Sequence, residues 1–295
     1  MFSPSLRLAL AVVLLGACSA LGSPRATAGV VRVVAAENFW GSIAQQVGGS
    51  HVQVTSIISD PTADPHLYES DAHDASAVAD AQLVIENGLG YDTFVDQLLS
   101  ASSARGRVVI SAAEVLHVRG SAADPHLWYD VPRVHLVVSA IAAQLAALDP
   151  ADKLTFSKNA ATFDKSLGPV LDALHAISTR HTGAAVAYTE RVPAYLFAAA
   201  GLVVKTPPGF ARAIEDGQEP SPGDTHAMEQ LMSSRAVRVL VYNAQATSSS
   251  TEHIRDLARG NGIPVVAVTE TMPRNTNYQA WQLAQTRQLL AALGA

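Results

Sequence analysis

Short apolar runs rich in β-branched residues alternate along this chain with longer stretches in which apolar residues recur every three or four positions. The first pattern is typical of buried strands and the second of amphipathic helices. Their alternation favours a parallel α/β sheet. In the first half of the chain, the predicted strands are 30–36, 52–58, 83–85 and 108–110, and the predicted helices are 39–47, 72–81 and 93–99.

A second series of alternating segments begins near residue 183. Its predicted strands are 184–188, 237–242 and 263–268, and its predicted helices are 193–200, 227–233, 251–259 and 278–293. The expected fold class is therefore α/β, with two α/β lobes that each contain a mostly parallel sheet. Residues 206–223 are rich in proline and acidic residues, and we predict an irregular loop there.

One long run with helical periodicity separates the two series, from Asp149-Pro150 to His181. It predicts a single long helix that connects the lobes. Gly168-Pro169 lies inside the run and marks a place where the helix could kink or divide. The predicted organisation is an N-terminal lobe at 30–148, a connecting helix at 149–182 and a C-terminal lobe at 183–295.

The N-terminal segment has a different pattern. An apolar run at 8–17 follows the single positive charge of Arg7, which is typical of a secretory signal peptide. The run is too short to cross a membrane, and it ends in Leu-Gly-Ala-Cys, which resembles the bacterial lipobox. We predict a lipoprotein signal peptide at 1–17, lipid attachment at Cys18 and a tether at 18–29. The alternative is an ordinary signal peptide followed by an incidental cysteine.

Charge and cysteine content narrow the classes of function. The chain has 20 Lys and Arg against 26 Asp and Glu, and it contains no basic run, so no nucleic-acid partner is expected. Cys18 is the only cysteine, which excludes a disulfide within the chain and a thiolate metal site. A small ligand or a protein partner is indicated.

The pentapeptide Ala-Asp-Pro-His-Leu occurs twice and places His66 and His126 in matching surroundings. The two histidines are too far apart in the chain for one helix face, so only the fold can bring them together. Two converging imidazoles suggest a metal ion. Asp64 and Asp124 stand two residues before the histidines, where they could accept a hydrogen bond from the other ring nitrogen or cap a turn.

Two carboxylates occupy the positions where open α/β sheets bind ligands, which are the carboxyl ends of strands. Glu190 follows the strand 184–188, and Glu270 follows the strand 263–268, each after one intervening residue. Two neutral imidazoles and two carboxylates would neutralise a divalent cation. Alternatively, Glu190 could form a surface ion pair with Arg191, and Glu270 could be an acid at a helix N-terminus.

Several segments also carry a family resemblance over essentially the whole mature chain. They are VVAAENFWGSIAQQVGG, SIISDPTADPHLYE, NGLGYD, DPHLWYD, YTE with AYLFAAAGL, VLVYNAQ and VTET. The chain resembles the zinc/manganese solute-binding lipoproteins of bacterial ABC transporters, the helical-backbone metal receptors. The resemblance implies two lobes bridged by a long helix, and metal bound between them. The implied metal ligands are His66, His126, Glu190 and Glu270.

The same resemblance implies a function outside the cytoplasm. A lipid-anchored, monomeric receptor would capture Zn²⁺, Mn²⁺ or Fe²⁺ and deliver it to a membrane permease with its ATPase. Two departures from the family concern the metal. Zinc-dedicated members often have histidine where this chain has Glu190, together with a histidine-rich loop that this chain lacks. The fourth position is usually aspartate, so the longer Glu270 is the expected labile ligand.

Two other functions would use the same ligands. A secreted metal-dependent hydrolase needs an open coordination position and a general base, whereas four protein ligands close the site, and the chain has no HExxH or GxSxG motif. An enzyme is therefore not expected. A surface adhesin or metal chaperone would differ from a transport receptor only in its partner. The other eight histidines, at 51, 73, 117, 135, 175, 181, 226 and 253, are expected to be ordinary polar side chains.

Overall fold

The computed structural model describes residues 1, 29–62, 65–102 and 104–294. Two four-stranded parallel sheets form two lobes, with the strand orders β2-β1-β3-β4 and β6-β5-β7-β8. The predicted α/β fold class is confirmed. Within the described part of the chain, no helix has both the length and the apolar character needed to cross a membrane. The predicted signal peptide, Cys18 and Asp64 lie outside the described residues.

The sheet of the N-terminal lobe is buried on both faces. Successive side chains of a strand point to opposite faces. Val33 and Ala35 of the central strand therefore join a core with helices α1 and α5, and Val34 joins a second core with α2 and α3. The strands are β1 (Val31–Glu37), β2 (Val52–Ile58), β3 (Leu83–Glu86) and β4 (Val108–Ser111). The helices are α1 (Asn38–Gly48), α2 (Ala72–Asp80), α3 (Thr93–Ala101), α4 (Ala112–Val115) and α5 (Val134–Leu148).

The C-terminal lobe repeats this layered arrangement. Its strands are β5 (Ala185–Tyr188), β6 (Val203–Val204), β7 (Leu240–Asn243) and β8 (Val265–Val268). Its helices are α8 (Ala194–Ala199), α9 (Pro208–Glu215), α10 (Pro222–Ser233), α11 (Ser249–Gly260) and α12 (Tyr278–Leu293). The prediction of an irregular loop at 206–223 was wrong, because α9 begins at Pro208 and buries Phe210 and Ile214. Proline suits the first turn of a helix, where its missing N–H has no partner to lose.

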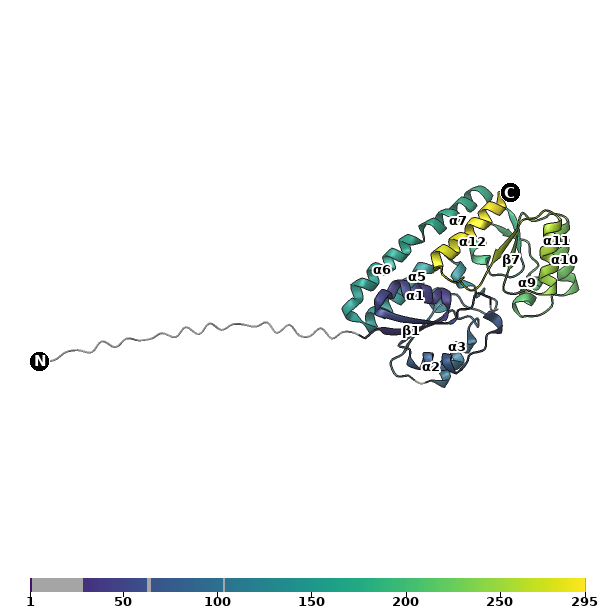
Figure 1. Ribbon diagram of the computed structural model, residues 1–295. Coiled ribbons are helices and arrows are strands. Elements are labelled where there is room, and N and C mark those ends of the chain that lie inside the picture. Colours follow the sequence, from purple (N-terminus) through teal and green to yellow (C-terminus); the bar gives the residue numbers. More distant parts are fainter. Residues whose placement is uncertain (2–28, 63–64, 103, 295) are drawn as a thin grey trace.

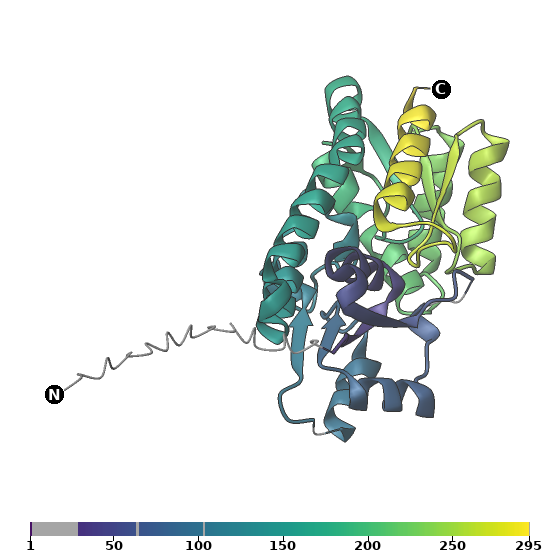
Figure 2. The ribbon, with the colours of Figure 1, turned by 60° about the vertical axis from the view of Figure 1, so that its left-hand side comes forward.

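The predicted connecting helix consists of two consecutive helices, α6 (Lys153–Ser166) and α7 (Gly168–His181). They meet at Leu167, next to the Gly168-Pro169 pair that marked a possible break. The two helices follow one side of the molecule from the first lobe to the second, and α12 packs beside α7 (Figures 1 and 2). The connection therefore extends along both lobes.

One apolar core continues through both lobes on the side of α6 and α7. Phe39 of α1 stacks on Trp128 of the N-terminal lobe, with ring centroids 4.3 Å apart, and on Trp281 of α12, with centroids 6.2 Å apart. Large buried aromatic rings contribute strongly to packing free energy. This shared core holds the lobes against each other, so that the loops at the carboxyl ends of both sheets face one another.

Candidate metal centre

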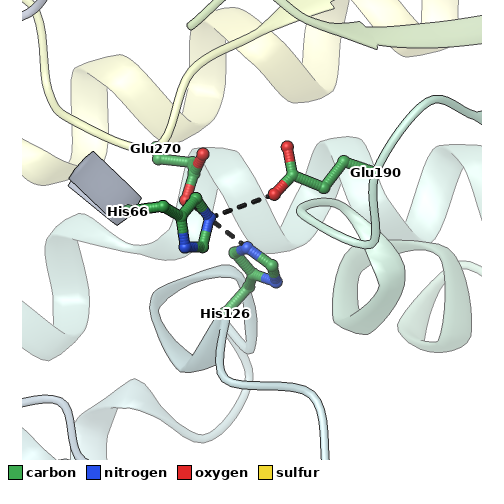
Figure 3. A group of neighbouring side chains, drawn as sticks. All are labelled: His66, His126, Glu190 and Glu270. Atoms are coloured by element: carbon green, nitrogen blue, oxygen red, sulfur yellow. Dashed lines mark hydrogen bonds and ion pairs between the residues drawn. The ribbon is translucent and has the colours of Figure 1, made fainter. Parts of the chain in front are cut away.

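The four side chains selected from the sequence meet between the lobes (Figure 3). His66, His126, Glu190 and Glu270 each offer one nitrogen or oxygen atom, and these atoms all lie within 4.8 Å of one another. His66 belongs to a short 3₁₀ helix, η2 (Pro65–Leu67), and His126 precedes another, η3 (Leu127–Tyr129). The glutamates follow β5 and β8. Each lobe thus supplies two of the four.

The distances between these atoms fit one shared ion. His66 Nε2 lies 3.1 Å from Glu190 Oε1 and 3.2 Å from Glu270 Oε2, and His126 Nε2 lies 3.5 Å from Glu270 Oε2. Two ligand atoms about 2.1 Å from one ion are about 3.0–3.4 Å apart at octahedral or tetrahedral angles. His126 Nε2 is buried and accepts no hydrogen bond from the described residues. A metal ion would satisfy it.

Asp124 orients the buried ring of His126. Its Oδ1 lies 2.6 Å from His126 Nδ1 and accepts the backbone N–H of His126 at 3.1 Å. Both roles that the sequence suggested for Asp124 are therefore filled by one oxygen. When a metal ion is bound, a proton held on Nδ1 would leave the lone pair of Nε2 directed at that ion. Asn87 Nδ2 donates to the carbonyl of Pro125 at 2.8 Å and so fixes this loop to the end of β3.

Asn243 joins the two carboxylates and was missed by sequence reasoning. Its Nδ2 donates to Glu190 Oε2 and, at 2.7 Å, to Glu270 Oε1. The backbone N–H of Gln245 donates to Asn243 Oδ1 at 3.0 Å, which sets the orientation of the amide. Tyr91 adds a donor to Glu270 Oε2 at 2.9 Å. Asn243 ends β7, so the strand-end rule that selected the glutamates could also have found it.

The structure does not support the two alternative roles of the glutamates. Arg191 forms its ion pair with Glu215, at 2.6 Å between Nη2 and Oε2, and Glu190 is only 1% exposed. Glu270 is fully buried in the loop between β8 and α12, before the helix begins at Tyr278. Neither carboxylate is therefore a surface ion pair or an acid in the first turn of a helix.

Gln245 ties together two ligand-bearing loops from different lobes. Its Oε1 accepts the backbone N–H groups of Glu270 at 2.6 Å and Thr271 at 3.0 Å. Its Nε2 donates to the carbonyl of Pro61 at 3.0 Å, five residues before His66. One side chain thus sets the position of the Glu270 loop relative to the His66 loop.

Two further contacts cross between the lobes near the site. Asn38 Nδ2 donates to the carbonyl of Met272 at 2.8 Å, and Asn38 Oδ1 accepts the N–H of Met272 at 2.9 Å. Tyr129 donates to the carbonyl of Thr269 at 2.7 Å. Hydrogen bonds on both sides of Glu270 hold its loop in place, so the carboxylate is presented by a well-supported backbone.

Comparison with known proteins shows a family match and similarity to several metal-binding proteins. A family model described as "Zinc-uptake complex component A periplasmic" matches residues 33–292. The manganese-binding lipoprotein MntA of Bacillus subtilis is 29% identical over 130 residues, 42% of each chain. The iron ABC transporter substrate-binding lipoprotein MtsA of Streptococcus pyogenes is 28% identical over 163 residues, 51% of this chain and 52% of the relative. The chain thus aligns with about half the length of these relatives.

Solved structures share the fold over most of the chain. The solute-binding protein FpvC of Pseudomonas aeruginosa, in complex with Mn²⁺, has a TM-score of 0.74 at 22% identity, covering 90% of this chain and 98% of that one. The periplasmic zinc-binding protein TroA of Treponema pallidum has a TM-score of 0.73 at 20% identity, covering 88% and 98%. At these identities the likeness establishes the two-lobed architecture.

Proposed function

The chain belongs to the family of periplasmic zinc-uptake complex component A, and from this premise we propose that it captures one divalent transition metal ion between its lobes and delivers it to an ABC transporter. The convergence of His66, His126, Glu190 and Glu270 carries the proposal. The ion is the cargo, and no chemistry is performed on it. The proposed partners are a membrane permease and its ATPase, which a monomeric receptor would contact.

The donor set leaves several divalent ions as possible cargo. Two imidazole nitrogens and two carboxylate oxygens suit Mn²⁺ and Fe²⁺, yet the Irving–Williams order makes Zn²⁺ bind more tightly than Mn²⁺. The named relatives include a manganese-binding and an iron-transporter lipoprotein, and TroA is described as zinc-binding. We propose that the protein binds Zn²⁺ in vitro, and that metal supply and the permease decide which ion is transported.

A hydrolytic function is less well supported by the same geometry. Catalytic zinc sites usually have three protein ligands and a coordinated water beside a free general base. Here the lobes supply four donors, and both carboxylates already accept hydrogen bonds from Asn243. As metal ligands, neither would be free to act as a base. We therefore propose a binding protein rather than an enzyme.

The proposed location is the outer face of the cell membrane, with a lipid on Cys18. The described relatives include lipoproteins, which supports export of this chain. An adhesin or a metal chaperone would carry the same site, so only the partner separates these functions from transport. Retention of the metal-loaded protein by membranes that contain its permease would favour transport.

Metal content provides the direct test of the proposed function. The purified protein is equilibrated anaerobically with equimolar Zn²⁺, Mn²⁺ and Fe²⁺, desalted to remove weakly held ions, and analysed for its elements. We expect about one tightly held ion per chain in the wild type and none in a His66→Ala, His126→Ala variant. A wild-type protein without tightly bound metal would contradict the proposal.

Replacing Asn243 with leucine tests how the carboxylates are held. The change removes the donor shared by Glu190 and Glu270 while keeping the number and branching of the side-chain heavy atoms. The two carboxylates would then repel each other without a bridging N–H group, and we expect Zn²⁺ affinity to fall about 10- to 100-fold, the usual effect of losing a group that orients a ligand. Competition with a chelator of known affinity measures the change. Asn159→Leu in α6 is the control, and equal affinities of the two variants would refute the role of Asn243.

A further inference from the structure

A second group of potential metal ligands lies outside the site between the lobes. His51, Asp149 and Asp152 each offer one ligand atom, and these atoms lie within 4.8 Å of one another. We propose that these three side chains form a second, weaker binding site for a divalent transition metal ion. The proposal goes beyond the capture of cargo and does not depend on it.

The two groups are at opposite edges of the first sheet. His51 ends the 3₁₀ helix η1 (Gly49–His51) immediately before β2, whereas His66 follows the other end of that strand. A strand of seven residues such as β2 spans about 20 Å. Asp149 and Asp152 lie at the turn η4 (Pro150–Asp152) between α5 and α6. An ion bound here would share no ligand with the cleft site.

The second group has the chemistry of a partial coordination shell. His51 Nδ1 lies 3.1 Å from Asp152 Oδ2, which is a normal separation for two ligands of one ion. One imidazole and two carboxylates would neutralise a divalent cation, and this mixture of nitrogen and oxygen donors suits Zn²⁺, Mn²⁺ or Fe²⁺. The side chains of His51 and Asp152 are 32% and 26% exposed, so water can complete the shell.

Asp149 supplies an independent reason to expect a cation. It is only 4% exposed, yet its carboxylate does not cap η4 and takes part in no hydrogen bond or ion pair among the residues described. Its oxygens are not among the fully enclosed polar atoms, so a partly hydrated cation can reach them. One of these oxygens lies close to the nitrogen of His51 and the oxygen of Asp152. Asp152 likewise stands at the N-terminus of α6 without capping it. A shared cation would satisfy both carboxylates.

An ion at this place would join two parts of the N-terminal lobe. His51 follows α1, and the aspartates precede α6, whose beginning packs against α1 (Figure 1). Ligands that bind only the folded state stabilise it in proportion to their occupancy. The second ion should therefore raise the unfolding temperature of the protein even when the cleft site cannot bind metal.

The test uses a protein whose cleft site is disabled. The variant His66→Ala, His126→Ala is titrated calorimetrically with Zn²⁺ alone, and its unfolding temperature is measured with and without Zn²⁺. We expect about one remaining equivalent of Zn²⁺ and a higher unfolding temperature in its presence. Adding His51→Ala should weaken this binding at least about 10-fold and abolish the thermal shift. Adding His73→Ala, which removes an exposed histidine of α2, should change neither result.

A second substitution keeps the test valid if the His51→Ala variant does not fold. Asp149→Asn keeps the shape of the side chain and removes its charge, so the metal-free unfolding temperature should be retained while the second equivalent is lost. The proposal is wrong if the His66→Ala, His126→Ala protein binds no Zn²⁺, or if His51→Ala and Asp149→Asn leave its binding unchanged. Failure of the transport proposal would instead appear as a missing tight equivalent in the wild-type protein.

Discussion

His126→Ala is expected to lower the affinity of the cleft site for Zn²⁺ by about 100- to 1000-fold. Four-ligand zinc sites bind with about 10–16 kcal/mol, so one ligand contributes roughly 3–4 kcal/mol. His126 is fully buried, and its Nε2 accepts no hydrogen bond from the described chain. Alanine would also leave Asp124 without the ring that it orients. Chelator competition at pH 7 measures the loss.

The matched control for this change is His73→Ala, because His73 is an exposed histidine of α2 that does not belong to the group of four. Its affinity should equal that of the wild type. A fall of less than about 10-fold in His126→Ala, with the fold intact, would contradict the assignment of His126 as a ligand. Circular dichroism and thermal unfolding establish that both variants are folded.

The contacts around the four candidate ligands also indicate which of them would move during the proposed release of the metal ion. Sequence reasoning selected Glu270 because glutamate departs from the family pattern. Glu270 is fully buried, however, and accepts hydrogen bonds from Asn243 and Tyr91, while Gln245 holds its backbone. The side chain of His66 is 22% exposed and approaches the glutamates from the opposite lobe. We therefore propose that His66 is the ligand that moves during the proposed release of the ion.

Sequence patterns selected the four candidate ligands because each stood out locally. His66 and His126 lie in a repeated pentapeptide, and Glu190 and Glu270 follow strands that periodicity predicts. The fold could be predicted for the same reason, since buried parallel strands form conspicuous apolar runs. The eight-residue α9 escaped because its prolines and acidic neighbours were taken as signs of a loop, although proline is also favoured in the first turn of a helix.

The residues that escaped sequence reasoning act through contacts between distant segments. Asn243 is important because it lies between two glutamates that come from different strands. The partner of Arg191 is Glu215 in α9, a helix that was not predicted. His51 meets Asp149 and Asp152 only because the end of α1 packs against the beginning of α6. Local patterns contain no signal for such pairings.

The affinity for Zn²⁺ is expected to rise steeply with pH, by up to about 100-fold per pH unit between pH 6 and 8.5. Burial opposes protonation of His66, but hydrogen bonds to Glu190 and Glu270 outweigh it and raise the pKa of His66 to about 11. Burial also opposes protonation of His126, but the charge of Asp124 contributes most to raising its pKa to about 10. At pH 7 in the metal-free protein, both imidazole rings therefore carry a second proton and are positively charged.

Metal binding then exchanges two protons for one divalent ion, and the net charge of the buried site is the same before and after. Because both pKa values lie above the pH of the experiment, raising the pH removes the competing protons and strengthens metal binding. The dependence ends only as the pH approaches 10 to 11, the pKa values of the two rings. Histidines with an ordinary pKa near 6.5 would give little dependence above about pH 7.5.

Two measurements check this exchange. Titrations in chelator-buffered Zn²⁺ at several pH values give the slope, and calorimetry in buffers with different ionisation enthalpies gives the protons released. We expect about two protons per ion at pH 7, against about 0.5 for two histidines with ordinary pKa values. Asp124→Asn is the matched variant. It removes the charge that holds the second proton on His126. The number of protons that this variant releases per Zn²⁺ bound at pH 8 should therefore fall towards one. A wild-type affinity that is constant from pH 6 to 8.5 would contradict this coupling.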